Sequence, residues 1–321
     1  MIFEEKIKNI YRGMMFTRYD DRGLAYYYSA ADFPGLGAEE YDFPSSEGHI
    51  LAGMLYSYPS PIAGRLVIFE HGIGGGHRSY MREIELLCRH GYSVLAYDHT
   101  GCWRSGGSDT GGLCHSLCDL NDCIEAVAHD QRFAGCDISV MGHSHGGFSA
   151  LNIYAWQPRV SHIVALCGFL SVELMAKTTF PGLLCGYRRP IIELEQQRNP
   201  KYSAANAAAT LADADTKILA IYSDNDRMCP RLHYDTLRAA IGDRPGARVE
   251  LVSGRGHNPN YTPNAVAYLG EYSAELARLQ KKRGNDMSDA ERAEFCSRFD
   301  WARMTEQDSD VWDMIFSALD S

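Results

Sequence analysis

The sequence DISVMGHSHGG at residues 137–147 decides the fold of this chain. Its first five residues are typical of a buried strand, and the small residues from Gly147 onward are typical of a helix. The G-x-S-x-G sequence between them lets the backbone turn sharply and raises the hydroxyl of Ser144 above the end of a sheet. The motif is weak alone, so the flanking strand and helix carry the prediction. Ser144 is therefore a candidate nucleophile.

A glycine-rich loop upstream offers a place where a substrate oxygen could be stabilised. The apolar run LVIFE at residues 66–70 predicts a strand, and HGIGGG follows at residues 71–76. Backbone amides in such a loop can approach a ligand closely, and the N–H of Ile73 is the first candidate donor. The amide of His145 is the second, because the first N–H groups of a helix lack internal partners. The alternatives are an ordinary turn at His71 and a His145 side chain that only covers its own turn.

Two loops further along the chain could supply the base and the orienting acid that a serine needs before it can attack. A predicted strand at residues 217–222 ends in a loop that carries two carboxylates, Asp224 and Asp226. The next predicted strand, residues 248–252, is followed by His257. Taken singly, the acid could be a turn former and the histidine a solvated loop residue. Their joint order of Ser, Asp and His is the one expected for a catalytic triad on a doubly wound sheet.

These motifs resemble those of the α/β-hydrolase superfamily, and more narrowly those of its monoacylglycerol lipase and serine aminopeptidase-like branch of carboxylic ester hydrolases. The matching segments are residues 71–75, 98–101 with 104–107, 142–147, Asp226 with Pro230, and Gly256 with His257. The resemblance favours Asp226 as the acid because of its distance from Pro230. Asp224 stays a second choice, because the family usually has glycine three residues before the acid, where this chain has Ser223.

The resemblance implies a serine hydrolase that cleaves a carboxylic ester, with a short- to medium-chain acyl ester or a monoacylglycerol-like compound as its substrate. Ser144 would then attack, His257 would transfer the proton, Asp226 would orient the imidazole, and the amides of Ile73 and His145 would hold the oxyanion. No cofactor is implied. A peptidase or amidase with the same triad is the alternative, since the motif fixes acyl transfer but not the leaving group. A silent ligand-binding protein is disfavoured, because binding alone does not need all three triad positions.

Six predicted strands alternate with helical patterns, which specifies a mainly parallel, doubly wound sheet covered on both faces. We therefore expect an α/β-hydrolase core formed by residues 1–168 and 217–284. The intervening residues 169–216 are longer than a simple connection and lie where the family inserts a cap. Residues 285–321 begin with a capping-box sequence and carry spaced apolar side chains, so we expect a C-terminal helical extension there that packs on the core or on a partner.

Apolar residues of the cap could line an acyl pocket, and the candidates are Phe169, Phe180 and Leu184. Trp103 is a fourth candidate: it stands where the family commonly has glycine, and it either walls the pocket or packs under its loop. The cap arginines, at positions 188, 189 and 198, could hold an anionic or polar end of the substrate. The alternative is that the apolar set is core and that the arginines form a solvated face.

Charge and composition argue against several classes of function. A formal net charge of −10, with no interleaving of basic and aromatic residues, disfavours a nucleic-acid partner. The first residues lack the basic and apolar regions of a signal peptide, and no apolar stretch approaches the length of about 20 residues that a membrane span needs. We therefore expect a cytoplasmic protein whose partner is a small acyl ester.

The cysteines are expected to be reduced, because several of the ten fall within predicted core elements. Cys114, His115, Cys118 and Cys123 lie close together in the sequence. Their spacing fits no zinc template, and the last two follow a helical pattern instead. No metal site is predicted.

Overall fold

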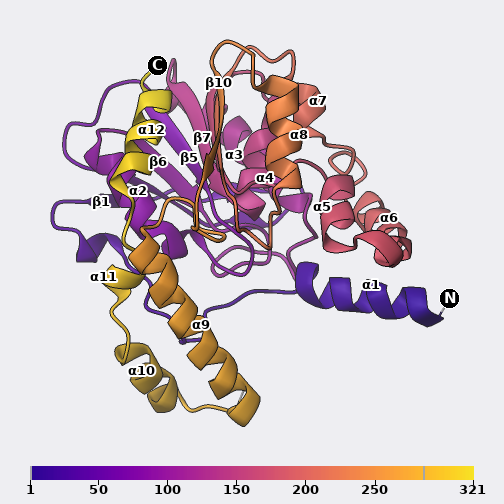
Figure 1. Cartoon of the computed structure of the whole chain (residues 1–321). Helices are drawn as coiled ribbons and strands as arrows, with labels where there is room; N and C mark the ends of the chain where they lie inside the picture. The colour runs from indigo at the N-terminus through magenta and orange to yellow at the C-terminus, as the bar shows by residue number, and fades with distance from the viewer. Residues whose placement is uncertain (1, 285) are drawn as a thin grey trace.

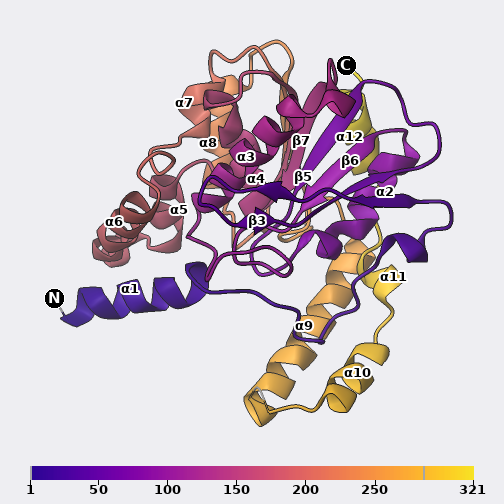
Figure 2. The same cartoon turned by 180° about the vertical axis from the view of Figure 1, so that it is seen from behind.

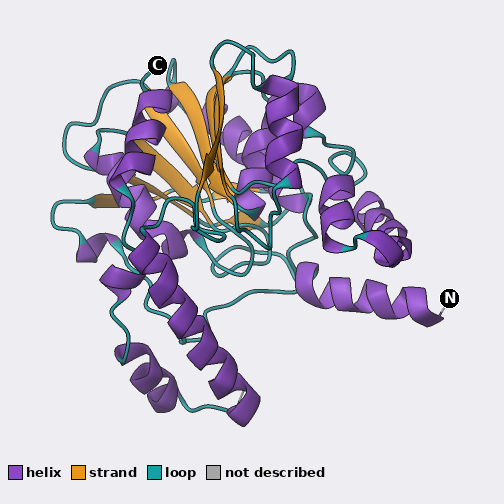
Figure 3. Cartoon of the chain, viewed as in Figure 1, coloured by secondary structure: helices purple, strands orange, loops and turns teal. Residues whose placement is uncertain are grey.

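The computed structural model describes residues 2–284 and 286–321. Within them an eight-stranded sheet runs through the centre of the molecule in the order β1-β4-β6-β5-β7-β8-β9-β10 (Figure 3). Its strands are β1 (Gly37–Glu40), β4 (Gly53–Ser57), β5 (Arg65–Glu70), β6 (Ser93–Tyr97), β7 (Asp137–His143), β8 (Val160–Leu166), β9 (Lys217–Ser223) and β10 (Ala247–Val252). β4 pairs antiparallel with β1 and β6, and the other neighbours pair parallel. The predicted mainly parallel, doubly wound sheet is confirmed.

Helices cover both faces of the sheet, which explains why the parallel strands read as continuous apolar runs. The first face packs against α3 (His115–His129), α4 (His145–Asn152) and α8 (Leu232–Ile241). The second packs against α2 (Met81–Arg89) and α12 (Ser309–Leu319), and Figure 2 shows the two layers from behind. Because the parallel strands end at one edge, the loops after β5, β7, β9 and β10 meet there. A separate short hairpin is formed by β2 (Phe43–Pro44) and β3 (Ile50–Leu51).

The C-terminal part of the chain first leaves the core and then returns to it. Its elements are α9 (Pro263–Arg283), α10 (Asp289–Ser297) and α11 (Trp301–Met304), followed by α12. α9 projects away from the sheet beside α10, and Ala265 is its only buried residue (Figure 1). α12 instead lays Trp312, Ile315 and Leu319 against the second face of the sheet. The segment expected as an extension thus supplies a helix of the core.

We expect Trp312→Ala to destabilise the protein by about 3–5 kcal/mol, the usual cost of removing a buried tryptophan side chain. Trp312 is buried in the second-face cluster, and its indole N–H donates to Gln307 Oε1 at 2.9 Å. The free energy of unfolding in urea measures the effect. Asp313→Ala, one residue further along and exposed, should change it by less than about 0.5 kcal/mol. Equal losses from both variants would contradict the packing described.

Residues 169–216 form helices at two places beside the core. α5 (Val172–Thr179), a 3₁₀ turn (Gly182–Tyr187) and α6 (Arg188–Arg198) lie together, and α7 (Ala207–Leu211) packs against α8 and α4. The first helix of the chain, α1 (Ile2–Met15), lies beside α5 and α6 in both views (Figures 1 and 2). In the described part of the chain, no helix is both long and apolar enough to cross a membrane.

Candidate active site

Ser144 lies at the turn where β7 ends and α4 begins, as the sequence predicted. It has φ 55° and ψ −110°, a conformation that residues with a side chain rarely adopt. The neighbouring glycines permit this turn. A Cβ on Gly142 would collide with the backbone of Gly146, and a Cβ on Gly146 would collide with the backbone of Glu70. The G-x-S-x-G pattern is therefore a packing requirement of the strand, turn and helix.

The structure brings Ser144, His257 and Asp226 together in a hydrogen-bonded row. His257 Nδ1 lies 2.7 Å from Asp226 Oδ2, and His257 Nε2 lies 2.7 Å from Ser144 Oγ. A carboxylate can only accept, so Nδ1 carries the ring proton and Nε2 is left bare to accept from the serine hydroxyl. This is the tautomer in which the imidazole can remove the proton of the serine.

Asp226 is held in place and kept ionised by the turn in which it lies. Its Oδ1 accepts the backbone N–H groups of Met228 at 2.8 Å and Cys229 at 3.1 Å. Burial by itself raises the pKa of this carboxyl, but the hydrogen bond and charge of His257, with the Cys229 amide, bring the pKa below its ordinary value. Asp226 is therefore present as a carboxylate at neutral pH.

Asp224, the second candidate acid, does not contact the histidine. It lies on the surface and accepts hydrogen bonds from Ser253 Oγ at 2.7 Å and from the N–H of Gly254 at 2.8 Å. These contacts tie the loop after β9 to the loop after β10, just before His257. Its role in the structure is to brace that turn.

The peptide that joins Gly72 to Ile73 is fixed by a buried histidine. His71 Nε2 accepts the N–H of His99 at 2.9 Å, so His71 Nδ1 carries the proton and donates to Gly72 O at 2.7 Å. Burial lowers the pKa of His71 well below its ordinary value, which keeps the ring neutral in this tautomer. In a trans peptide the N–H points opposite to the C=O, so the N–H of Ile73 is directed away from His71.

The amide of His145 is the first of α4, where helix N–H groups have no partner within the helix. Its side chain is turned elsewhere: Nε2 donates to Leu113 O at 2.8 Å, and burial lowers the pKa of the ring to about 3. The side chain thus joins the turn to the loop before α3, while the backbone amide lies next to Ser144. Ile73 and His145 both line the cavity above Ser144.

A chain of hydrogen bonds through Tyr80 and His143, which the sequence did not reveal, connects the glycine-rich loop after β5 to the loop that carries His257. Tyr80 Oη accepts the N–H of Gly72 at 3.0 Å and lies 2.8 Å from His143 Nδ1, while His143 Nε2 lies 2.6 Å from His257 O. A carbonyl only accepts, so Nε2 of His143 carries the proton. Burial lowers the pKa of His143 to about 3, so the ring is neutral and Nδ1 accepts from the hydroxyl of Tyr80. Only the fold could reveal this pairing.

A cavity of about 670 Å³ opens above Ser144 and is walled mainly by apolar side chains. Of the four predicted pocket residues, Phe169 and Phe180 line it, and Leu184 and Trp103 do not. Leu184 lies on the 3₁₀ turn and is 45% exposed. Trp103 packs edge-on against Tyr27, with ring centroids 4.6 Å apart, which matches the reading of a tryptophan packed at its loop.

The cap arginines also lie outside the lining of the cavity. Arg188 Nε donates to Phe180 O at 2.8 Å, and Arg189 pairs with Glu193. Arg198 forms a two-pronged ion pair with Glu47 at 2.6 and 2.7 Å. Each guanidinium thus binds another group of the protein outside the cavity, which agrees with the alternative that these arginines form a solvated face.

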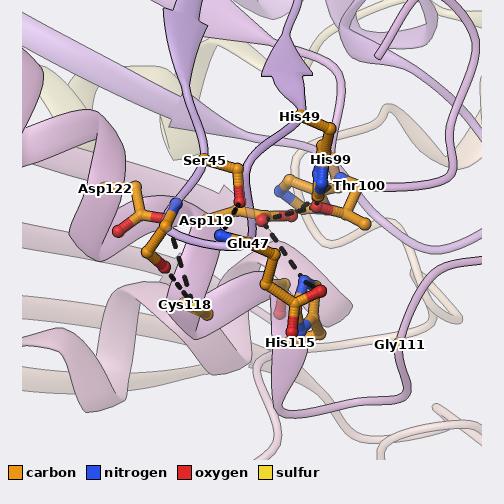
Figure 4. Close-up of polar contacts among 12 residues, drawn as sticks. Ser45, Glu47, His49, His99, Thr100, Gly111, His115, Cys118, Asp119 and Asp122 are labelled. Atoms are coloured by element: carbon orange, nitrogen blue, oxygen red, sulfur yellow. Dashed lines mark hydrogen bonds and ion pairs between the residues drawn. The ribbon is translucent and has the colours of Figure 1, made fainter. Parts of the chain in front are cut away.

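The stretch from Cys114 to Cys123 takes part in a polar network that holds the loop after β6 (Figure 4). Asp119 accepts both the N–H and the hydroxyl of Thr100 at 2.7 Å, and His49 Nε2 lies 2.8 Å from the same hydroxyl. His115 Nε2 lies 3.7 Å from carboxylate oxygens of Asp119 and Glu47. These contacts position a loop that lies behind the glycine loop.

Among the described residues, one group of side chains has the types and spacing to hold a metal ion. It consists of Cys167, Asp226 and His257, whose ligand atoms lie within 4.8 Å of one another. Asp226 and His257 are already engaged with each other, and burial raises the pKa of the Cys167 thiol, which opposes the thiolate that a metal requires. We assign no metal to this group.

The fold and the elbow define an α/β-hydrolase, which confirms the resemblance seen in the sequence. Residues 62–242 match the model of the serine aminopeptidase S33 family, and the chain therefore belongs to that family.

Curated relatives share limited identity with the chain. A "Putative carbamate hydrolase RutD" of Pseudomonas syringae pv. syringae is 26% identical over 66% of this chain and 87% of its own length. The protein of the same name from Agrobacterium fabrum is 29% identical over 29% of this chain, and that match spans about a third (34%) of the relative.

Solved structures share the fold. The Pyrococcus furiosus esterase Pf2001 superimposes with a TM-score of 0.58 and 18% sequence identity, over 84% of this chain and 98% of its own. At this identity the likeness concerns the fold and not the substrate.

Proposed function

We propose that this hydrolase cleaves carboxylic esters through an acyl-enzyme formed on Ser144. The observation that carries the proposal is the pair of 2.7 Å contacts that join Ser144, His257 and Asp226. His257 Nε2 takes the serine proton as Oγ attacks the acyl carbon, and Asp226 stabilises the imidazolium that forms. His257 then protonates the leaving alcohol. A water molecule, activated in the same way, attacks the acyl carbon and restores Ser144.

The amides of Ile73 and His145 stabilise the negative charge on the substrate oxygen in this proposal. Both residues border the cavity at Ser144, and both peptides are fixed before a substrate arrives. Donors that do not need to reorganise are worth more than donors in water, and one such donor commonly contributes about 10²- to 10³-fold to kcat.

The cavity favours an acyl ester over the alternative of a peptidase. An aminopeptidase has to accommodate the charged amino group of its substrate, for which a carboxylate is the natural partner. Among the described residues that line the cavity there is no Asp or Glu, and its two charged side chains, Lys6 and Arg227, are cationic. The remaining lining is largely apolar, which suits a hydrocarbon chain better than a small polar carbamate.

A panel of p-nitrophenyl acyl esters, run beside aminoacyl anilides and a simple N-alkyl carbamate, tests the proposal. We expect turnover of the esters, with a far lower kcat/KM for the other two classes. A higher kcat/KM for the anilides would replace the proposal by the peptidase alternative. A higher value for the carbamate would align the chain with the activity named for its relatives.

We expect Tyr80→Phe to lower kcat roughly 10- to 100-fold with a small change in KM. The variant keeps the ring but removes the hydroxyl that accepts from Gly72 and donates to His143. Leaving such buried groups unpaired costs about 1–3 kcal/mol, and here the cost falls on the alignment of the oxyanion donors with His257. Tyr58→Phe, whose hydroxyl donates to Glu85 outside the lining of the cavity, is the control and should behave as wild type. A loss of thermal stability with unchanged kcat would assign Tyr80 to packing alone.

A further inference from the structure

One wall of the cavity comes from α1, a helix that the sequence did not connect with the site. Ile7, Ile10, Tyr11 and Met14 recur at the spacing of a single helix face, and all four line the cavity that reaches Ser144. Ile10 and Met14 are 57% and 60% exposed, although large apolar side chains are normally buried. Tyr11 and Ile7 pack against the core, whereas Ile10 and Met14 leave this face of α1 open toward the cavity.

The opposite wall is formed by the cap. Phe169, Met175, Phe180 and Ile191 line it, from the start of the cap through α5 to α6. Figure 1 shows α1 running beside α5 and α6. Tyr11 on one wall and Met175 and Ile191 on the other belong to the same buried apolar cluster, so the two walls are joined through the core. The cavity between the two walls reaches Ser144. An acyl group attached to Ser144 can therefore extend along this apolar groove.

A buried carboxylate fixes α1 relative to the nucleophile. Glu195 on α6 is fully buried and accepts the hydroxyl of Tyr11 at 2.7 Å. It also accepts the backbone N–H groups of Leu113 at 2.8 Å and Cys114 at 3.1 Å. The carbonyl of the same Leu113 accepts from His145, the residue after the elbow serine. Glu195, which anchors α1, and His145, at the turn of the nucleophile, are therefore each one hydrogen bond from Leu113.

The anchor lies at the end of α1 nearer to the core, and the apolar face extends beyond it. The lining residues of α1 run from position 6 to position 15, about 13 Å along the helix axis. An extended hydrocarbon chain advances about 1.3 Å per carbon, given C–C bonds near 1.5 Å, so the groove matches a chain of roughly ten carbons. The groove is open to solvent at Ile10 and Met14, so it does not exclude longer acyl chains.

We propose that α1 is the specificity wall of this enzyme and that the groove between α1 and the cap binds the linear, apolar acyl chain of a medium- to long-chain ester. The assignment rests on the ester hydrolysis proposed above. The acyl chain lies against Ile10 and Met14 on one side and Phe180 on the other. A substrate of two carbons does not reach this wall.

The test compares p-nitrophenyl decanoate with p-nitrophenyl acetate. The double variant Ile10→Ser with Met14→Ser should lower the ratio of kcat/KM for decanoate to kcat/KM for acetate by roughly 10- to 100-fold. Both side chains are exposed, so the fold should be retained, and circular dichroism checks this. Arg12→Ser, on the same helix but outside the cavity lining, is the matched control and should leave the ratio at the wild-type value. Ile10→Trp should narrow the groove and move the preferred acyl length to shorter chains.

Failure of this inference and failure of the proposed function give different results. A wild-type enzyme that hydrolyses neither ester refutes the proposed function. A wild-type enzyme that hydrolyses both esters, with the ratio unchanged in the double variant, refutes the role of α1. An unchanged ratio together with a change in oligomeric state by light scattering would mean that a second copy covers this face of α1, which also overturns the proposal.

Discussion

Ser144→Ala should lower kcat for ester hydrolysis by about 10⁴- to 10⁶-fold, leaving only the rate that the oxyanion donors and substrate binding supply. The substitution removes the oxygen that His257 contacts at 2.7 Å but leaves the strained turn in place. A fluorophosphonate probe, with the labelled peptide read by mass spectrometry, should modify Ser144 in the wild-type protein and nothing in the variant.

Ser108→Ala is the control for this experiment, because Ser108 lies on an exposed loop away from the cavity. It should keep both labelling and turnover. Label retained by Ser144→Ala, or label found on another serine of the wild-type protein, would contradict the assignment of the nucleophile.

Asp226→Asn should lower kcat about 10⁴-fold with the fold retained, and Asp224→Asn should have a mild effect. An amide at position 226 can donate to His257 Nδ1, which favours the tautomer with the proton on Nε2, where it can no longer accept from Ser144. At position 224 the loss concerns two surface hydrogen bonds that brace the loops.

Steady-state kinetics of the two variants measure the ranking, and far-ultraviolet circular dichroism shows whether each is folded. The reverse ranking would mean that the acid of the site is Asp224. Comparable large losses from both variants would indicate that the turn held by Asp224 matters as much as the hydrogen bond to His257.

The sequence predicted those features whose causes are local. The turn at Ser144 leaves no room for a Cβ at Gly142 or Gly146, so five consecutive residues are enough to predict it. The inner parallel strands read as largely apolar runs because both of their faces are covered, and their order in the chain sets the fold class. Asp226 could be separated from Asp224 only through the family spacing to Pro230, since both acids follow the same strand.

The features that the sequence missed depend on contacts between distant segments. The hydroxyl of Tyr80 reaches His143 across 63 residues, and Tyr11 reaches Glu195 across 184. Apolar character alone could not predict which cap residues face the cavity. Phe180 and Leu184 are both large and apolar, but only Phe180 lines the cavity, and Leu184 is exposed on the turn that follows α5.

The closing of the second face by α12 has a consequence for synthesis of the protein on the ribosome. The last strand of the sheet ends at Val252, and Trp312, Ile315 and Leu319 follow only after α9, α10 and α11 have been made. At about 5–20 residues per second, the roughly 60 to 65 intervening residues take several seconds. For that interval α2 covers only its own part of the second face, and the part that α12 later covers stays exposed, which favours aggregation.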